Sequence, residues 1–86
     1  MFVIAFEIGG KTYYLTASGA MATGWKLIGG SWYYFDTKSG AMKTGWLQDG
    51  KYWYYLTPGT GVMVTGTVVI DSKTYKFNSS GQWIEE

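Results

Sequence analysis

The chain has 86 residues, seven basic and six acidic, and a formal net charge of +1. That length suffices for one small domain but buries too little surface for a deep enclosed cleft, and the balanced charge indicates neither a nucleic-acid nor an anionic-membrane partner. The chain has no cysteine and no histidine, which excludes disulfides, thiolate metal sites and the commonest general base. No apolar run is long enough to insert into a membrane.

An internal repeat of 20 to 21 residues organises the chain. Each unit ends near a glycine that begins a three-residue group, at Gly19, Gly40, Gly61 and Gly81. Alternating glycine and aromatic residues predict short β-hairpins, which must stack because an isolated hairpin is marginal in water. We therefore expect a single all-β module over residues 1–86. It would be a β-solenoid of about four stacked β-hairpin repeats, with units at about 1–23, 24–44, 45–65 and 66–86.

The first unit is degenerate. Ala5 and Thr12 stand where the second unit carries Trp25 and Trp32. Atypical end units are expected in a stacked repeat, because each end lacks one neighbour. The apolar start of the chain has neither a basic n-region nor a long apolar stretch, so it is not a credible signal peptide.

The second unit predicts a hairpin with a defined register. Residues 25–28 and 31–35 are strand-like, and Gly29-Gly30 between them accepts the positive φ of a two-residue turn. Such a turn pairs Leu27 with Trp32 and Trp25 with Tyr34. Side chains alternate along a strand, so these four residues share one face. The other face carries Lys26, Ile28, Tyr33 and Phe35.

The third unit repeats this pattern, with Asp49-Gly50 as its hairpin turn. This hairpin is expected to contain one residue more than that of the second unit, namely Tyr52. A β-bulge accommodates an extra residue in one strand. We therefore expect a bulge to shift the register of this hairpin.

The fourth unit is degenerate like the first. Thr67 and Thr74 replace its tryptophans, and Lys76 stands where a second tyrosine would be. Trp83 takes the methionine position of this unit. Exposed aromatic ends tend to find partners, so Trp83 is expected to cap the stack or to support self-association through the terminal hairpin.

Residues 23–46 read TGWKLIGGSWYYFDTKSGAMKTGW and resemble the choline-binding repeat, also called the cell-wall-binding repeat. This family occurs in surface proteins and cell-wall hydrolases of pneumococci, related streptococci and their phages. Its pattern is a GW pair, a short hairpin, a W-Y-Y-F/L run and then G-x-M. Residues 24–66 match it through two units, and residues 9–23 and 67–84 match it in part.

The resemblance implies choline sites between consecutive hairpins, each with two tryptophans from one hairpin and an aromatic residue from the next. The first site would use Trp25, Trp32 and Tyr54, with Tyr55 as the alternative and Met42 as a lining residue. The second would use Trp46, Trp53 and Tyr75, with Met63 nearby. Lys76 would disfavour a cation in the second site if its ammonium pointed inward. A quaternary ammonium has no N–H to donate and binds the negative faces of aromatic rings, which fits these residue types.

The expected function is that of a non-catalytic binding module, with no cofactor and no metal. Its partner would be choline or phosphocholine of teichoic and lipoteichoic acids, whose many copies compensate for weak single sites. The module would be secreted and associated with the cell wall, as a fragment of a larger protein that it anchors there.

Other interpretations stay open. Related repeats bind glucans, for which Gln48 and Asp49 are the main hydrogen-bonding candidates. The chain would also suit a truncated or engineered repeat scaffold. Aromatic residues on strands commonly pack across to neighbouring strands, and methionines commonly fill gaps. A carboxylate pair for glycoside hydrolysis, Asp36 with Glu7 or Asp71, is disfavoured because nothing in the sequence brings these residues together.

Overall fold

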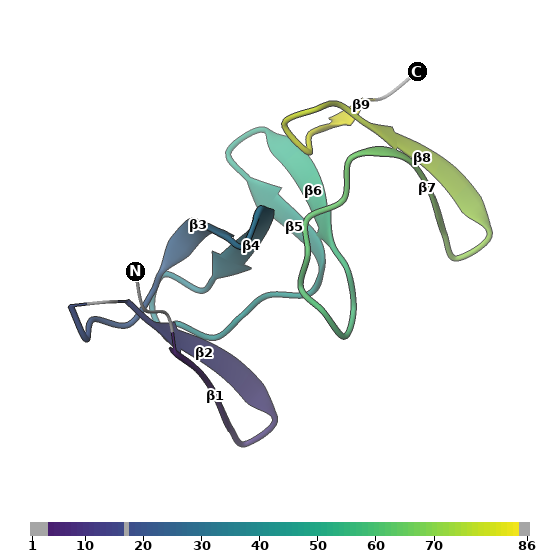
Figure 1. The fold of residues 1–86 in the computed structure, drawn as a ribbon. Helices are drawn as coiled ribbons and strands as arrows, with labels where there is room; N and C mark the ends of the chain where they lie inside the picture. Colours follow the sequence, from purple (N-terminus) through teal and green to yellow (C-terminus); the bar gives the residue numbers. More distant parts are fainter. Residues whose placement is uncertain (1–3, 17, 85–86) are drawn as a thin grey trace. The chain divides into compact units, whose positions relative to one another are not determined.

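The computed structural model describes residues 4–16 and 18–84, and the regular elements within them are β-strands (Figure 1). Over these ranges no helix is long and apolar enough to cross a membrane. The chain divides into two compact units, Met1–Lys43 and Thr44–Glu86. The first contains β1 (Ile4–Ile8), β2 (Lys11–Leu15), β3 (Gly24–Ile28) and β4 (Ser31–Phe35). The second contains β5 (Gly45–Asp49), β6 (Tyr52–Leu56), β7 (Gly66–Ile70), β8 (Lys73–Phe77) and β9 (Trp83–Ile84). The expectation of an all-β chain of hairpins is confirmed.

The hairpins share one register. In each of the pairs β1–β2, β3–β4, β5–β6 and β7–β8, five residues pair with five residues. The predicted pairing of Leu27 with Trp32 and of Trp25 with Tyr34 is confirmed. The turn of this hairpin is Gly29-Gly30, with φ values of 60° and 86° that only glycine adopts at no cost.

The predicted bulge in the third hairpin is wrong. Asp49 pairs with Tyr52 as Ile28 pairs with Ser31, so Tyr52 belongs to the regular ladder. The two-residue loop is Gly50-Lys51 rather than Asp49-Gly50. Gly50, with φ 65°, then occupies the first central position of the turn, which a type II′ turn reserves for glycine.

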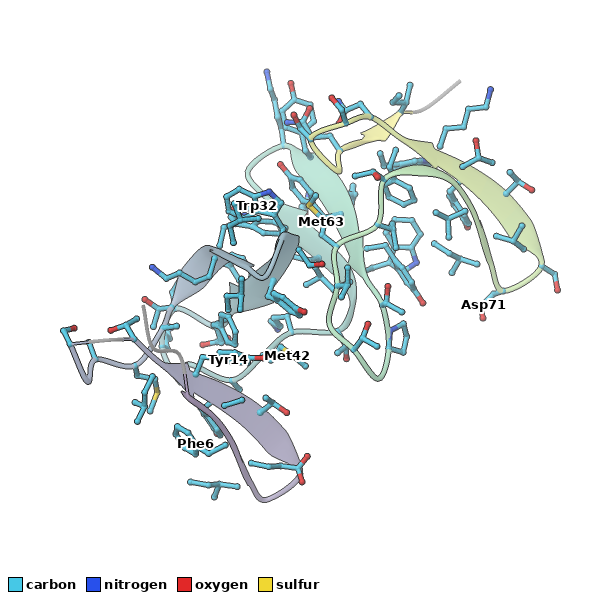
Figure 2. The ribbon with its side chains drawn as sticks, in the orientation of Figure 1. Phe6, Tyr14, Trp32, Met42, Met63 and Asp71 are labelled. Atoms are coloured by element: carbon cyan, nitrogen blue, oxygen red, sulfur yellow. The ribbon has the colours of Figure 1, made fainter. Side chains whose placement is uncertain are left out.

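The fourth hairpin turns without glycine. Asp71 and Ser72 form its loop with φ values of 50° and 68°, and Figure 2 shows Asp71 at the tip of this hairpin. Aspartate tolerates the left-handed region better than most residues because its short side chain bonds locally.

A short polar residue follows each hairpin, at Thr16, Asp36, Thr57 and Asn78. The carboxylate of Asp36 accepts hydrogen bonds from the backbone N–H groups of Lys38 (2.8 Å) and Ser39 (2.9 Å). The chain then returns to the hairpin it has just left. Met21, Met42 and Met63 pair with Leu15, Phe35 and Leu56, and Trp83 pairs in the same way with Phe77. Residue 83 is therefore confirmed as the structural equivalent of the methionines.

Each hairpin has two faces. Within a unit, one face of the first hairpin packs on the other kind of face of the hairpin that follows. We call the face that carries positions 25 and 32 of the second hairpin, and their equivalents elsewhere, the tryptophan face, and the opposite face the tyrosine face. In the first unit Tyr14, on the tryptophan face of β1–β2, lies 5.2 Å from Phe35 between ring centroids. Phe35 belongs to the tyrosine face of β3–β4 and is fully buried. Leu56 is fully buried at the equivalent position, and Phe77, the next equivalent, is also buried.

Candidate ligand-binding site

A pocket of about 370 Å³ lies in the second unit, between the tryptophan face of β5–β6 and the tyrosine face of β7–β8. Four side chains line it, and all four are aromatic: Trp46, Trp53, Tyr75 and Trp83. This volume falls at the lower end of the range for small-molecule sites.

Trp46 is the central wall of the pocket. Its ring centroid lies 6.3 Å from that of Trp53, 5.0 Å from that of Tyr75 and 6.1 Å from that of Trp83. The corresponding angles between ring planes are 81°, 69° and 66°. Aromatic pairs favour such edge-to-face contacts, so the rings support one another and form the sides of an open box instead of a closed stack.

The strand register explains why these rings converge. Trp46 pairs with Tyr55 and Gln48 pairs with Trp53, so both tryptophans project from the tryptophan face of their hairpin. Tyr75 projects from the tyrosine face of the next hairpin. Lys76 follows Tyr75 directly, and successive side chains on a strand point to opposite faces. The exposed Lys76 side chain therefore leaves from the face opposite the pocket, which removes the concern that its ammonium points inward.

The chemistry of the pocket is that of binding. The polar atoms on its four side chains are indole N–H groups and a phenol, so the lining supplies neither a carboxylate nor an imidazole for acid–base catalysis. Among the described residues, no group of three or more acidic residues could hold a metal ion. Apolar contact and attraction between a cation and the ring faces are what this pocket can offer.

Three residues of the second predicted site, Trp46, Trp53 and Tyr75, thus line one pocket. Met63 is placed differently. Its sulfur lies against Gly81, so closely that a β-carbon on that glycine would overlap it. The fourth wall is Trp83, which the sequence assigned to a cap or a self-association surface. The signal that could have placed Trp83 in the pocket was its position in the Gly81-Gln82-Trp83 group, because the corresponding groups of the other repeats end in methionine.

The first hairpin, β1–β2, lacks such a pair of tryptophans. Ala5 and Thr12 occupy the positions equivalent to Trp46 and Trp53 on its tryptophan face. These residues give this face no indole walls.

The residues of the first predicted site belong to both units. Trp25 packs on Tyr34 at 5.1 Å, and the Trp32 side chain is 41% exposed. The backbone N–H of Met42 donates to the carbonyl of Thr12 (2.8 Å). In the second unit, Tyr55 lies against Trp46 at 5.2 Å, whereas Tyr54 occupies the strand position equivalent to that of Tyr75. This site stays a prediction from the sequence.

Known proteins are similar to this chain in sequence and fold. Residues 6–45 match the model of the choline-binding repeat, and residues 44–63 match that of a putative cell wall binding repeat. No curated protein matches the chain. The choline binding domain of Spr1274 from Streptococcus pneumoniae is 35% identical, with 94% of this chain and 93% of that chain covered and a TM-score of 0.79.

Two longer proteins are also similar. The multimodular pneumococcal cell wall endolysin from phage Cp-1, complexed with choline, is 34% identical with a TM-score of 0.84. CbpJ from Streptococcus pneumoniae TIGR4 is 40% identical with a TM-score of 0.70. The matches cover 95% and 93% of this chain but only 24% of the endolysin and 34% of CbpJ. The repeat matches and the similarity over nearly the whole Spr1274 domain show that this chain belongs to the choline-binding repeat family.

Proposed function

We propose that this chain is a non-catalytic module that binds choline and anchors the protein to which it belongs to the cell wall. The observation that carries the proposal is the pocket lined by Trp46, Trp53, Tyr75 and Trp83. A trimethylammonium group donates no hydrogen bond that it would lose on leaving water, and the ring faces attract its charge. Each close ring contributes about 0.5–2 kcal/mol, which corresponds to roughly millimolar affinity after the costs of association.

The natural ligand in this proposal is phosphocholine of teichoic and lipoteichoic acids. A polymer that carries many such groups binds a weak site by effective concentration, because each bound group keeps its neighbours close. The similar endolysin is complexed with choline in one structure and with a peptidoglycan analogue in another, which supports a ligand in the cell wall. The module would then be located outside the cell, bound to the cell wall.

The architecture proposed with this function is a β-solenoid of about four hairpin repeats. Its support is the shared register of the hairpins and the packing of a tryptophan face on the next tyrosine face within each unit. Repeats of this kind contact mainly their neighbours, so a ligand pocket forms where one repeat meets the next.

Glucan binding is the weaker alternative. Sugars need hydrogen-bonding side chains beside the rings, and the candidates Gln48 and Asp49 are exposed and do not line the pocket. The aromatic lining therefore favours a cation without donors over a ring of hydroxyl groups.

Tryptophan fluorescence tests the proposal directly. The chain is titrated with choline and, separately, with a glucan oligomer, and its retention on a quaternary-amine resin is measured. We expect choline to change the fluorescence at roughly millimolar concentrations and to elute the chain from the resin, whereas the glucan oligomer has no effect. A chain that neither responds to choline nor binds the resin would refute the proposal, and a response to the glucan alone would favour the alternative.

A further inference from the structure

We infer that Trp83 is a specificity-determining wall of the pocket, whose ring makes the pocket prefer a quaternary ammonium over a neutral group of the same shape. This inference rests on the proposed choline-binding function. It concerns the lining position at which the last repeat carries an indole where the other repeats carry a thioether, since the equivalent residues are Met21, Met42 and Met63.

The equivalence is set by backbone pairing. Trp83 pairs with Phe77 as Met63 pairs with Leu56 and as Met42 pairs with Phe35. A methionine at this position would fill space with a flexible thioether. An indole also fills space, but its negative ring face attracts a cation.

Trp83 is held in place by its aromatic neighbours. Its ring lies 6.1 Å from that of Trp46 and 5.9 Å from that of Tyr75, at interplanar angles of 66° and 65°. The side chain is half-buried between them. Contacts of this geometry restrict the indole before any ligand arrives, so little entropy is lost when a ligand binds.

The backbone before Trp83 is held as well. The side-chain oxygen of Asn78 accepts hydrogen bonds from the backbone N–H groups of Ser80 (3.0 Å) and Gln82 (2.9 Å). Its side-chain nitrogen donates to the side-chain oxygen of Gln82 (2.9 Å). Gly81 meanwhile lies against the sulfur of Met63. Asn78 and Met63 are therefore positioning residues for Trp83. Met63 thus contributes to the pocket without lining it.

Discrimination of charge must come from the rings, since all four lining residues are aromatic. Apolar contact does not distinguish a trimethylammonium from a tert-butyl group, whereas the ring quadrupole does. Removing one ring of four should therefore weaken binding of the cation more than binding of its neutral analogue. Removing a residue that only completes the shape of the pocket would weaken binding of both ligands by the same factor.

The test measures binding of choline and of its neutral isostere 3,3-dimethylbutan-1-ol to the full chain. Binding is followed by NMR through the indole N–H signal of Trp53, which lines the same pocket. In Trp83→Met we expect choline binding to weaken by roughly 3- to 10-fold and isostere binding by less than about 2-fold. Trp83→Phe keeps a ring and should preserve the preference for choline. Tyr52→Leu, which removes an exposed ring of the same unit outside the lining, should change neither affinity.

Equal losses for the two ligands in Trp83→Met, or no loss for either, would overturn the inference without affecting the proposed function of the unaltered chain. If Trp83→Met does not fold, a lost preference for choline in Trp83→Phe overturns it instead. The unaltered chain is titrated first, and if it does not bind choline, the proposed function fails and this inference with it.

Discussion

The sulfur of Met63 occupies the space that a side chain on Gly81 would need. The same relationship joins Met21 and Gly40 in the first unit. Both glycines have positive φ, 83° and 79°. The methionine of one repeat thus packs on the glycine of the next. This contact is a structural reason for both residues to recur in the repeats.

Gly81→Ala should therefore destabilise the chain by about 2–4 kcal/mol, the sum of backbone strain and overlap with Met63. Gly66→Ala is the control, because Gly66 has φ 76° but open space around its Cβ position. It should cost only the strain, about 1–2 kcal/mol. Urea unfolding measures both. Equal losses of stability in the two variants would show that overlap with Met63 contributes nothing. The double variant Gly81→Ala with Met63→Ala should lose less stability than the two single variants combined, because the overlap is then removed.

Leu56→Ala should lower the free energy of unfolding by about 2–4 kcal/mol, because a fully buried side chain leaves a cavity. Val69→Ala in the same unit is the comparison. Its side chain is 67% exposed, so the loss should stay within about 0.5 kcal/mol. Similar losses for the two variants in urea unfolding would contradict the assignment of Leu56 to the core.

Trp53→Ala should weaken choline binding at its pocket by at least about 10-fold, since it removes one ring and opens the box to water. Tyr52→Ala is a closely matched control. Tyr52 is 40% exposed and Trp53 is 38% exposed, but only Trp53 lines the pocket. The loss is read from the indole N–H signal of Trp46 during a choline titration. Unchanged binding in Trp53→Ala, or the same loss in Tyr52→Ala, would place the site elsewhere.

Asp36 should make stability depend on acidity. Backbone hydrogen bonds from Ser39 and Lys38 lower the pKa of its carboxyl, because they favour the charged form. The contribution is therefore complete above the usual pKa of aspartate and is lost as the pH falls through the lowered value. We expect Asp36→Asn to be less stable than the unaltered chain at neutral pH and equally stable in acid. Thermal unfolding over this pH range measures the difference, and a gap that stays constant would contradict the assignment.

The one wrong element of the predicted fold shows how local signals compete. An Asp-Gly pair is a strong turn signal, and placing Asp49-Gly50 in the loop left Tyr52 without a partner. The ladder from Gly45 to Leu56 instead repeats the ladder from Gly24 to Phe35 residue for residue. Two turn placements satisfy the local chemistry of Gly50, and the regular pairing of the whole hairpin selects one of them.

The sequence by itself determined the hairpins, their period and the face that Trp25 and Trp32 share. These features follow from turn residues and from the alternation of side chains along a strand, which act over a few neighbouring residues. Only the tertiary structure decided that Trp83 joins Trp46, Trp53 and Tyr75, and that Met63 packs beneath Gly81. Those contacts depend on how β7–β8 and β9 pack against β5–β6, and no local pattern specifies the distance between side chains on different hairpins.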